Sequence, residues 1–206
     1  MKTSKRVVDI GASLVALVVA APIIVAAAVV IRLREGGPVL YSSSRVGEAG
    51  VPFRLLKLRT MVPGAASHRL GSVTVADDPR VTPTGRFLRR YKLDELPQLV
   101  NVLAGQMSLV GPRPECPEFV SAYTDEQRQV LRYRPGITSP ASIVYLDEAG
   151  RLAAESDAVR VYREQILPDE LRIDLDYMEQ ATVRSDLRVV ARTVAALVTS
   201  RGDRHG

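Results

Sequence analysis

Residues 10–31 form a run of 22 amino acids without one charged side chain, in a chain of 206 residues. Basic residues flank the run on both sides: Lys2, Lys5 and Arg6 before it, and Arg32 and Arg34 after it. A helix of this length reaches about 33 Å, which is enough to cross the hydrocarbon core of a membrane. This segment therefore predicts that the chain meets a membrane at its N-terminal end.

Three interpretations of the run compete. A cleaved signal peptide fits the basic start, but the run is longer than the usual ~7–15 apolar residues of such a peptide. A full membrane span fits the length. A re-entrant hairpin fits Pro22, which lies near the middle and kinks or breaks a helix. The basic residues at both ends satisfy the positive-inside rule if both ends face the cytoplasm, so a kinked span and a hairpin both stay open.

One charged residue, Asp9, stands at the edge of this run. It can cap the helix, pair with a nearby cation or be solvated. The chain length suits one compact domain with appendages, and 46% hydrophobic residues exclude a disordered chain. The single cysteine, Cys116, excludes an intramolecular disulfide and fits a reducing compartment.

The net charge of +5 is unevenly distributed. Residues 1–140 hold 19 lysines and arginines against 11 acidic residues, whereas residues 141–206 hold 9 against 12. This distribution favours an anionic partner for the first two thirds of the chain. Anionic lipid, a phosphorylated substrate and nucleic acid all fit the charge, but sparse aromatic residues and the absence of Trp argue against base stacking.

Two short strands, residues 39–42 and 53–59, are expected to pair as a hairpin around a turn at residues 47–52. Lys57 and Arg59 are two positions apart, so they are expected on one face, either solvated or aimed at an anion. The following residues 61–83 predict a long loop. His68 in this loop and His205 at the tail have no metal-ligand neighbours, so no zinc site is expected.

Residues 86–115, RFLRRYKLDELPQLVNVLAGQMSLVGPRPE, combine unlike chemical groups more densely than any other stretch. Thr84 is the predicted N-cap of a short basic helix. Arg86, Arg89 and Arg90 would share one face of it, where they repel each other unless an anion lies across them or lipid headgroups solvate them.

Asp94 and Glu95 stand at a predicted helix start that is followed by Pro97, and Gly105 ends the helix. Acidic residues in a first turn complement the helix dipole and serve stability alone in many proteins. Beside cations, however, such a carboxylate is expected to have a lowered pKa, and an ionised aspartate can attack phosphorus. Two adjacent carboxylates can also hold Mg²⁺ together with substrate phosphates.

A rigid turn, Gly-Pro-Arg-Pro at residues 111–114, holds Arg113 between two prolines. A guanidinium suits bidentate contact with phosphate, and a rigid turn loses little entropy on binding. A structural turn with a solvated arginine is the alternative.

Taken together, these segments resemble the bacterial sugar transferases, the monotopic phosphoglycosyl transferases that start cell-surface glycan assembly. The resemblance covers about residues 5–138 and rests on the Pro-interrupted N-terminal segment, GPVLYSSSRVG, FRLLKLRTM, RFLRRYKLDELPQLVNVLAGQMSLVGPRP and YRPGIT. It implies transfer of a phosphosugar from a UDP-sugar to a polyprenyl (undecaprenyl) phosphate, with release of UMP. The implied reaction is ping-pong, through a covalent phosphosugar–aspartate intermediate.

The resemblance also implies the site residues. Asp94 is the expected nucleophile, and Glu95 is its partner in a dyad that binds Mg²⁺. The expected phosphate-binding residues are Arg89 and Arg113, with less defined roles for Lys57, Arg59 and Arg86. A non-catalytic rival remains, a membrane-tethered basic module that binds anionic lipid or nucleic acid.

The implied fold is α/β, mostly helical with short strands. Residues 1–35 are expected to form a re-entrant helix–break–helix, bent at Ala21-Pro22. Residues 36–206 are expected to form a cytoplasmic catalytic domain with interfacial amphipathic helices, on the inner (cytoplasmic) membrane of a bacterium. Membrane lipids are the implied partner, nucleic acid is not expected, and a homo-oligomer is left open. The family often has Ser-Pro at the bend, so Ala21 departs from it and loses a stabilising hydroxyl bond.

The chain departs from the familiar pattern again after YRPGIT, where Ser139-Pro140-Ala141-Ser142-Ile143 replaces a glycine and a WAQV- or LAQV-like run. The segment to about residue 184 is therefore expected to contribute to sugar choice or lid geometry. A helix over residues 153–165 is expected to end at Pro168, and residues 169–178 suggest another. Residues 186–200 predict an amphipathic helix that packs on the core or embeds in the membrane surface.

Overall fold

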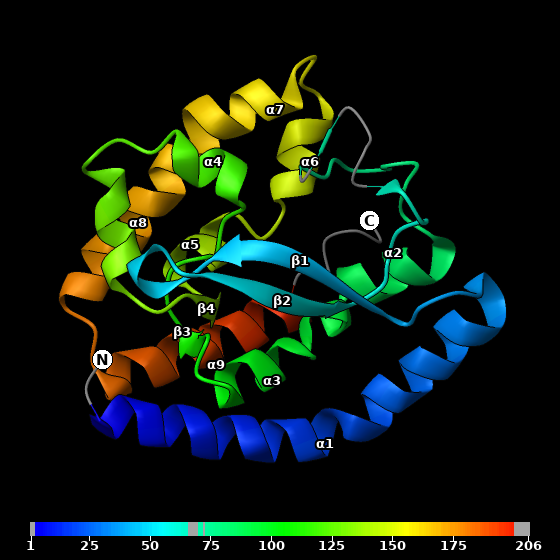
Figure 1. Cartoon of the computed structure of the whole chain (residues 1–206), viewed down its shortest axis with the longest axis horizontal. Helices are drawn as coiled ribbons and strands as arrows, with labels where there is room; N and C mark the ends of the chain where they lie inside the picture. The colour runs from blue at the N-terminus through cyan, green and yellow to red at the C-terminus, as the bar shows by residue number, and fades with distance from the viewer. Residues whose placement is uncertain (1–2, 66–69, 72, 200–206) are drawn as a thin grey trace.

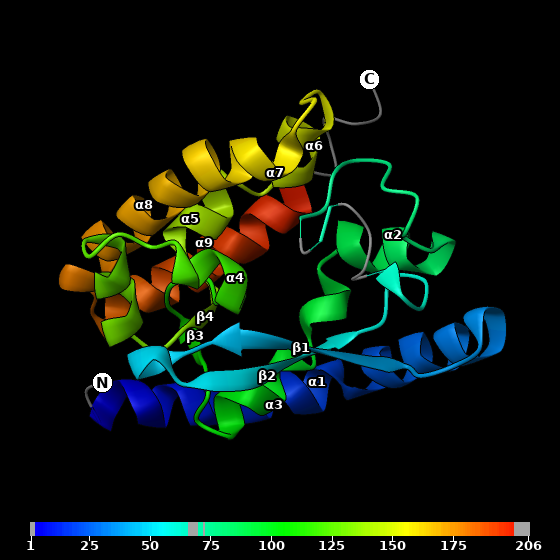
Figure 2. The same cartoon turned by 45° about the horizontal axis from the view of Figure 1, so that its top comes forward.

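A computed structural model describes residues 3–65, 70–71 and 73–199, so His68 and His205 lie outside the described residues. The chain is mostly helical with short strands, as the sequence predicts. Figure 1 shows the long helix α1 (Thr3–Glu35) along one side of the molecule and the hairpin of β1 and β2 beside it. Figure 2 shows a helical layer, formed by α5 to α8, on the far side of that hairpin from α1, whereas α9 packs against α1.

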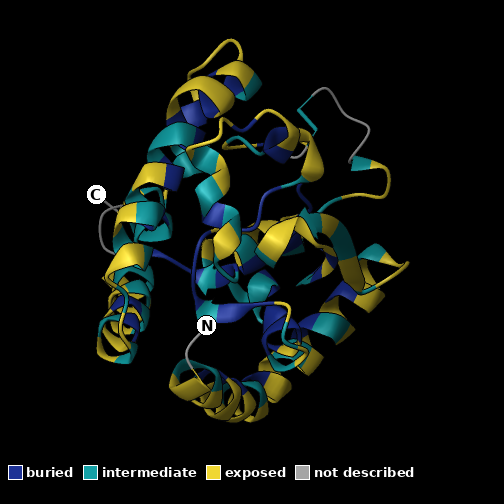
Figure 3. Ribbon diagram, turned by 60° about the vertical axis from the view of Figure 1, so that its left-hand side comes forward, coloured by how far each residue is buried: buried dark blue, intermediate teal, exposed yellow. Residues whose placement is uncertain are grey.

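Helix α1 is continuous through Pro22, and its axis bends along its length (Figure 1). Its buried face consists of Asp9, Ser13, Ala20, Ala27 and Ile31. Small residues on this face let the helix approach the domain closely, whereas most of its large aliphatic residues are exposed; Figure 3 colours buried and exposed residues along the ribbon. Among the described residues, this is the one helix that is long and apolar enough to cross a membrane.

The predicted hairpin is confirmed. Strand β1 (Leu40–Val46) pairs antiparallel with β2 (Pro52–Leu58), and the short 3-10 turn η1 (Glu48–Gly50) joins them. Strand β1 is longer than predicted because its run of three serines continues the pairing. The hairpin directs Phe53, Leu55 and Leu58 of β2 into the protein.

A second pair of strands carries the Gly-Pro-Arg-Pro turn. Strand β3 (Ser108–Val110) pairs parallel with β4 (Gly136–Thr138). A Cβ on Gly136 would lie 2.1 Å from the backbone nitrogen of Gly111, so only glycine permits this close approach. The turn that holds Arg113 therefore starts directly at the end of β3.

The central stretch begins with helix α2 (Pro83–Arg90). Thr82 caps this helix, since its Oγ1 accepts a hydrogen bond of 3.0 Å from the backbone of Gly85. The prediction that Thr84 caps this helix is wrong, because the helix already begins at Pro83, one residue before Thr84. The next turn, η3 (Leu93–Glu95), is 3-10, and α3 (Gln98–Leu103) starts only after Pro97. The acidic pair thus occupies a separate turn before the predicted helix.

The C-terminal half adds six helices and two further turns to the described residues. These are α4 (Pro117–Ser121), η4 (Gln127–Arg132), α5 (Pro140–Val144), α6 (Glu148–Ala153), α7 (Ala158–Val161), the π-helical turn η5 (Tyr162–Ile166), α8 (Leu167–Glu179) and α9 (Val183–Thr199). The predicted helix over residues 153–165 is wrong, because residues 154–157 interrupt it. Pro168 does not end a helix either. It stands in the first turn of α8, and the wider π turn before it accommodates the missing backbone donor.

Three hydrophobic clusters hold the described elements together, and one of them packs Phe53 and Leu55 of β2 against Val102 and Met107. The largest one joins the hairpin to the helical layer through residues such as Val46, Phe119, Leu152 and Tyr162. A smaller one packs Ala27 and Ile31 of α1 against Leu58 and Leu88, so the second half of α1 is fixed to β2 and α2. On α9, by contrast, Leu187, Val194 and Val198 are more than half exposed.

Candidate active site at the Asp94–Glu95 turn

The acidic pair lies in the turn η3, between α2 and α3. Lys92 precedes the turn in a left-handed conformation (φ 53°), which reverses the chain sharply and directs both carboxylates inward. Asp94 is 4% exposed. Its Oδ1 atom is buried and has no hydrogen-bond partner within the described part of the chain. Such an oxygen is costly to bury unless something outside the chain binds it.

Glu95 has a partner on the hairpin. The Nζ atom of Lys57, on β2, donates a hydrogen bond of 2.8 Å to Glu95 Oε1. Both side chains are less than one quarter exposed, so water screens this ion pair only partly. The prediction that Lys57 faces an anion is consistent with this contact, although the anion here belongs to the protein.

The pKa values of the two carboxylates are shifted in opposite directions. Burial and the adjacent charge of Glu95 raise the pKa of Asp94, against the attraction of Lys57 and Lys92. The expectation of a lowered pKa is therefore wrong for Asp94, because desolvation outweighs the nearby cations. Burial would also raise the pKa of Glu95, but Lys57 and Lys92 hold that pKa well below its usual range. The pair thus combines a firmly ionised carboxylate with a poorly solvated neighbour.

Arg89 is turned toward the loop that precedes α2. Its Nε donates to Thr60 Oγ1 at 2.8 Å, and its Nη1 donates to Thr74 Oγ1 at 3.2 Å. Burial lowers the pKa of Arg89 and the charge of Asp94 opposes this shift, so the guanidinium lies within electrostatic range of the pair. Arg86 and Arg90 are exposed on the outside of α2. The structure therefore brings Arg89 to the pair and leaves Arg86 on the surface.

Arg113 contacts Glu115 and lies within electrostatic range of Glu95. Its side chain is 40% exposed, its Nε lies 3.6 Å from Glu115 Oε1, and its charge helps to lower the pKa of Glu95. It also lines a small open hollow. The other polar residues that line this hollow are Arg45, Glu115, Glu148 and Tyr162. Glu148 and Tyr162 come from the segment where the chain departs from the expected family pattern.

Arg59 has a different environment from Lys57. It is buried just beyond the end of β2, where its Nη2 donates to the carbonyl of Gly36 and lies 3.9 Å from Glu35 Oε2. It thus holds the connection between α1 and β1. The structure does not bring it together with Asp94 and Glu95.

Sequence reasoning missed several residues that build the site. Asn101 of α3 is buried and hydrogen bonds the backbone of β2 at Arg54 and Leu56, so it fixes the strand that carries Lys57. Its position on the polar side of a predicted helix gave no signal of this role. Arg45 and Glu115 were within reach of sequence reasoning, since one lies in the RVG segment and the other directly follows Pro-Arg-Pro.

The described residues contain no group of three or more His, Cys, Asp and Glu side chains that could hold a metal ion. The acidic pair alone supplies carboxylate oxygens, one of them the unpartnered Asp94 Oδ1. Two carboxylates fit Mg²⁺, because this ion commonly takes one or two carboxylates and completes its shell with water and substrate phosphates. The residues present therefore fit a magnesium ion that arrives with a phosphorylated substrate.

Comparisons with known proteins identify the family of this chain. The family model described as bacterial sugar transferase matches residues 1–200. The UDP-glucose:undecaprenyl-phosphate glucose-1-phosphate transferase of Caulobacter vibrioides is 38% identical over 199 residues, which cover 95% of this chain and 70% of that protein. The UDP-N-acetylgalactosamine-undecaprenyl-phosphate N-acetylgalactosaminephosphotransferase of Aeromonas hydrophila is 35% identical over 97% of this chain, but this covers only 45% of that protein. The exopolysaccharide production protein ExoY of Sinorhizobium fredii is 33% identical over 97% of this chain and 87% of its own length.

Proposed function

The chain belongs to the bacterial sugar transferase family, and from this membership and its buried acidic pair we propose a two-step phosphosugar transfer centred on Asp94. It is a phosphoglycosyl transferase whose relatives are named for UDP-sugars and undecaprenyl phosphate. The proposed reaction moves a sugar phosphate from a UDP-sugar to undecaprenyl phosphate and releases UMP. The observation that carries the proposal is the buried, unpartnered Oδ1 of Asp94 beside the Lys57–Glu95 ion pair.

In the first step, a carboxylate oxygen of Asp94 attacks the phosphorus that bears the sugar. The new bond joins oxygen to phosphorus, the bond to the bridging oxygen of the diphosphate breaks, and UMP leaves with its electron pair. In the second step, a phosphate oxygen of undecaprenyl phosphate attacks the same phosphorus and releases the Asp94 carboxylate. Such displacements depend mainly on positioning and on neutralising phosphate charge.

The surrounding residues supply that positioning. Arg89 and Arg113 both lie within electrostatic range of the pair, and we assign them to hold the phosphates against Asp94. Lys57 keeps Glu95 ionised, so a negative charge stands next to the attacking carboxylate of Asp94. Burial excludes water from Asp94, which increases the reactivity of its oxygen toward phosphorus.

We include Mg²⁺ in the proposal, held by Asp94 and Glu95 together with the diphosphate. When bound, it would neutralise charge on the diphosphate and on the departing UMP. The support for this assignment is the fit of two carboxylates, one with a free oxygen, to a hard cation.

The proposed location is the cytoplasmic face of a bacterial inner membrane, with α1 as a bent, re-entrant helix. Two observations support it: the apolar side chains that α1 directs away from the domain, and the exposed apolar residues Leu187, Val194 and Val198 of α9. This arrangement would let a water-soluble UDP-sugar and a lipid phosphate reach the same turn.

The nucleophile is tested by Asp94→Asn. We expect it to abolish UMP release from a panel of UDP-sugars with undecaprenyl phosphate, because an amide cannot form the acyl phosphate. Asp125→Asn is the matched control, since Asp125 is exposed and distant in sequence from the turn. Undiminished turnover of Asp94→Asn would refute the assignment. Salt-sensitive vesicle binding without any turnover of the wild type would instead support the non-catalytic rival.

The topology is tested separately by labelling Thr3→Cys and Pro38→Cys in sealed vesicles, each in a Cys116→Ser background. Both positions are exposed at the ends of α1. A re-entrant helix predicts that both cysteines react from the same side of the membrane. Accessibility from opposite sides would show a full span.

A further inference from the structure

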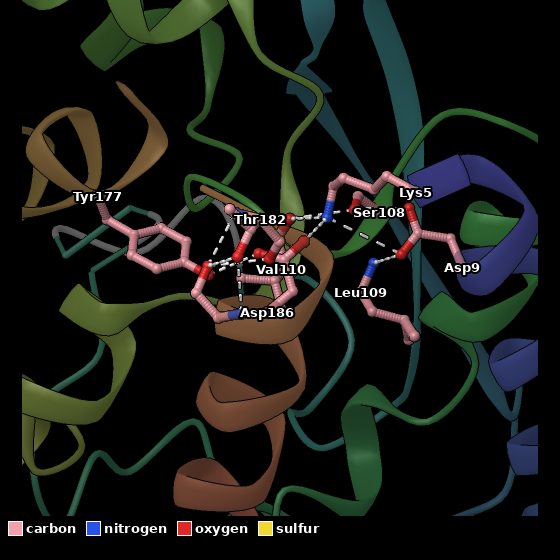
Figure 4. A network of polar contacts seen from close by, with 9 residues as sticks. Lys5, Asp9, Ser108, Leu109, Val110, Tyr177, Thr182 and Asp186 are labelled. Carbon is pink, nitrogen blue, oxygen red and sulfur yellow. Dashed lines mark hydrogen bonds and ion pairs between the residues drawn. The ribbon is translucent and has the colours of Figure 1, made fainter. Parts of the chain in front are cut away.

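Lys5, the first charged residue in the described part of the chain, is held within the protein. Figure 4 shows Lys5 reaching from α1 toward α9 and β3. Its Nζ donates to Asp186 Oδ2 at 2.5 Å and to the carbonyl of Val110 at 3.1 Å. Its side chain is only 15% exposed. A lysine that served only to satisfy the positive-inside rule would remain in water or among headgroups.

Asp9 completes the attachment one helical turn later. Its carboxylate lies 4.0 Å from Lys5 Nζ. It also accepts hydrogen bonds from Ser108 Oγ at 2.8 Å and from the Leu109 backbone nitrogen at 3.3 Å (Figure 4). Asp9 is 3% exposed, so its charge depends on these partners. Of the three roles open to Asp9 from the sequence, pairing with a nearby cation agrees with the structure. All three residues of β3 are thereby fastened to the start of α1.

On its other side, the Lys5 contact continues into the helical layer. Tyr177 of α8 donates from its hydroxyl to Asp186 Oδ1 at 2.6 Å, so Asp186 joins Lys5 and Tyr177 through its two oxygens (Figure 4). Burial and the hydrogen bond to Asp186 raise the pKa of Tyr177, so it remains a neutral donor. The contact thus joins α1, β3, α8 and α9.

Arg6 makes a parallel attachment to the other half of the site. Its Nη1 donates to the carbonyl of Val102 at 2.7 Å, and its Nη2 donates to the carbonyl of Leu103 at 3.1 Å. These are the last two residues of α3, where the helix dipole makes a cation favourable; the Val102 carbonyl also accepts from the backbone of Gly105 at 3.0 Å. Arg6 therefore caps the helix that follows Asp94 and Glu95.

Two adjacent cations thus connect the membrane helix to the two segments that carry the phosphate-facing groups. Strand β3 leads within three residues to Arg113, and α3 follows the acidic pair after two residues. The UDP-sugar arrives from water and meets the two segments already packed against each other. A lipid acceptor is different, because its phosphate sits at a height that the membrane fixes, and α1 sets the height of the domain.

We propose that Lys5 and Arg6 are positioning residues that fix the acidic pair and Arg113 at the height of the lipid phosphate. This inference rests on the proposed function. It predicts a selective defect: loosening the attachment should impair the reaction with undecaprenyl phosphate and spare the reaction with the UDP-sugar. In a ping-pong enzyme, kcat/KM for each substrate reports its own half of the reaction, so the two effects are separable.

The test uses the full chain in vesicles, with Lys5→Met as the main variant. We expect kcat/KM for undecaprenyl phosphate to fall about tenfold and kcat/KM for the UDP-sugar to stay within about twofold, where tenfold corresponds to ~1.4 kcal/mol. Lys5→Arg keeps the charge and should recover most of the loss. Arg34→Met is the control, because it removes an exposed charge at the opposite end of α1.

If Lys5→Met fails to accumulate, Asp186→Asn carries the same test, since it weakens the ion pair and still accepts from Tyr177. An equal loss of both kcat/KM values would indicate merely less folded enzyme and would overturn the positioning role. No loss, or the same loss in Arg34→Met, would overturn it as well. Absence of UMP release by the wild type would refute the proposed function itself, which is a distinguishable result.

Discussion

Replacing Asn101 by alanine should loosen the contact between helix α3 and strand β2. The Asn101 side chain makes three hydrogen bonds: it accepts from the Leu56 backbone nitrogen at 3.0 Å, and it donates to the Arg54 carbonyl at 2.8 Å and to Gln106 Oε1 at 2.7 Å. Asn101 is 2% exposed, so water does not readily replace these partners. At ~1 kcal/mol for each bond, the loss of stability should be about 3 kcal/mol.

Thermal unfolding in detergent measures this loss. In a chain of this size, ~3 kcal/mol corresponds to a decrease of roughly 6–12 °C in Tm. Gln106→Ala is the matched control, since it removes only one of the three bonds, from an exposed side chain, and should cost about 1 kcal/mol or less. The neighbouring Lys57 should shift with the strand, so kcat should decrease as well. An Asn101→Ala variant no less stable than Gln106→Ala would refute this reasoning.

Three further predictions concern the site and its surroundings. Lys57→Met should lower kcat roughly 10–100-fold, the equivalent of one charge-assisted hydrogen bond, because Glu95 loses its 2.8 Å partner; unchanged steady-state turnover would contradict this. Glu170→Gln should stabilise the folded chain relative to wild type, and this gain should increase as pH rises from about 4.5 to about 8. Burial raises the pKa of Glu170 to about 8, so in this pH range the folded wild type holds a proton that the unfolded chain releases. The gain reaches at most roughly 3 kcal/mol at pH 7, and melting curves that show a gain independent of pH would contradict the prediction. Gly85→Ala should displace α2 and lower both Tm and activity, since a Cβ there would lie 2.1 Å from the Thr60 carbonyl; wild-type values of both would show that the helix yields freely.

The hairpin was predictable from local sequence. Asp94, Glu95 and Arg113 stand in short segments whose prolines and glycines restrict the backbone, but their roles are implied by the family resemblance and stay predictions. Arg89 is turned inward beside the buried Leu88, where it donates to Thr60 and Thr74. These features depend on interactions within about thirty residues.

Features that depend on burial were not accessible from the sequence. The pKa of Asp94 rises because the turn is enclosed by distant elements, and a local count of nearby cations predicted the opposite direction. Arg59 separates from Lys57 because β2 ends at Leu58, so the alternation of a strand no longer applies beyond it. Pro168 continues a helix because a π turn precedes it, which the pattern of prolines alone does not reveal.

Long-range contacts account for the remaining difference. Lys5 and Asp186 are 181 residues apart in sequence and 2.5 Å apart in the fold. From the sequence, Lys5 was a flanking charge of a membrane segment, and the start of α9 was part of an amphipathic helix with two possible environments. Only the packing of α1 against β3 and α9 shows that the two residues meet.

Mass spectrometry of the chain after incubation with its UDP-sugar, without undecaprenyl phosphate, tests the central claim most directly. A UDP-sugar that supports UMP release in the presence of acceptor is the substrate to use. The proposed mechanism predicts about one released UMP per enzyme and an added sugar phosphate on the peptide that contains Asp94. Undecaprenyl phosphate should then remove the adduct. Transfer without any adduct on Asp94, or UMP release only when acceptor is present, would contradict a covalent reaction at this residue.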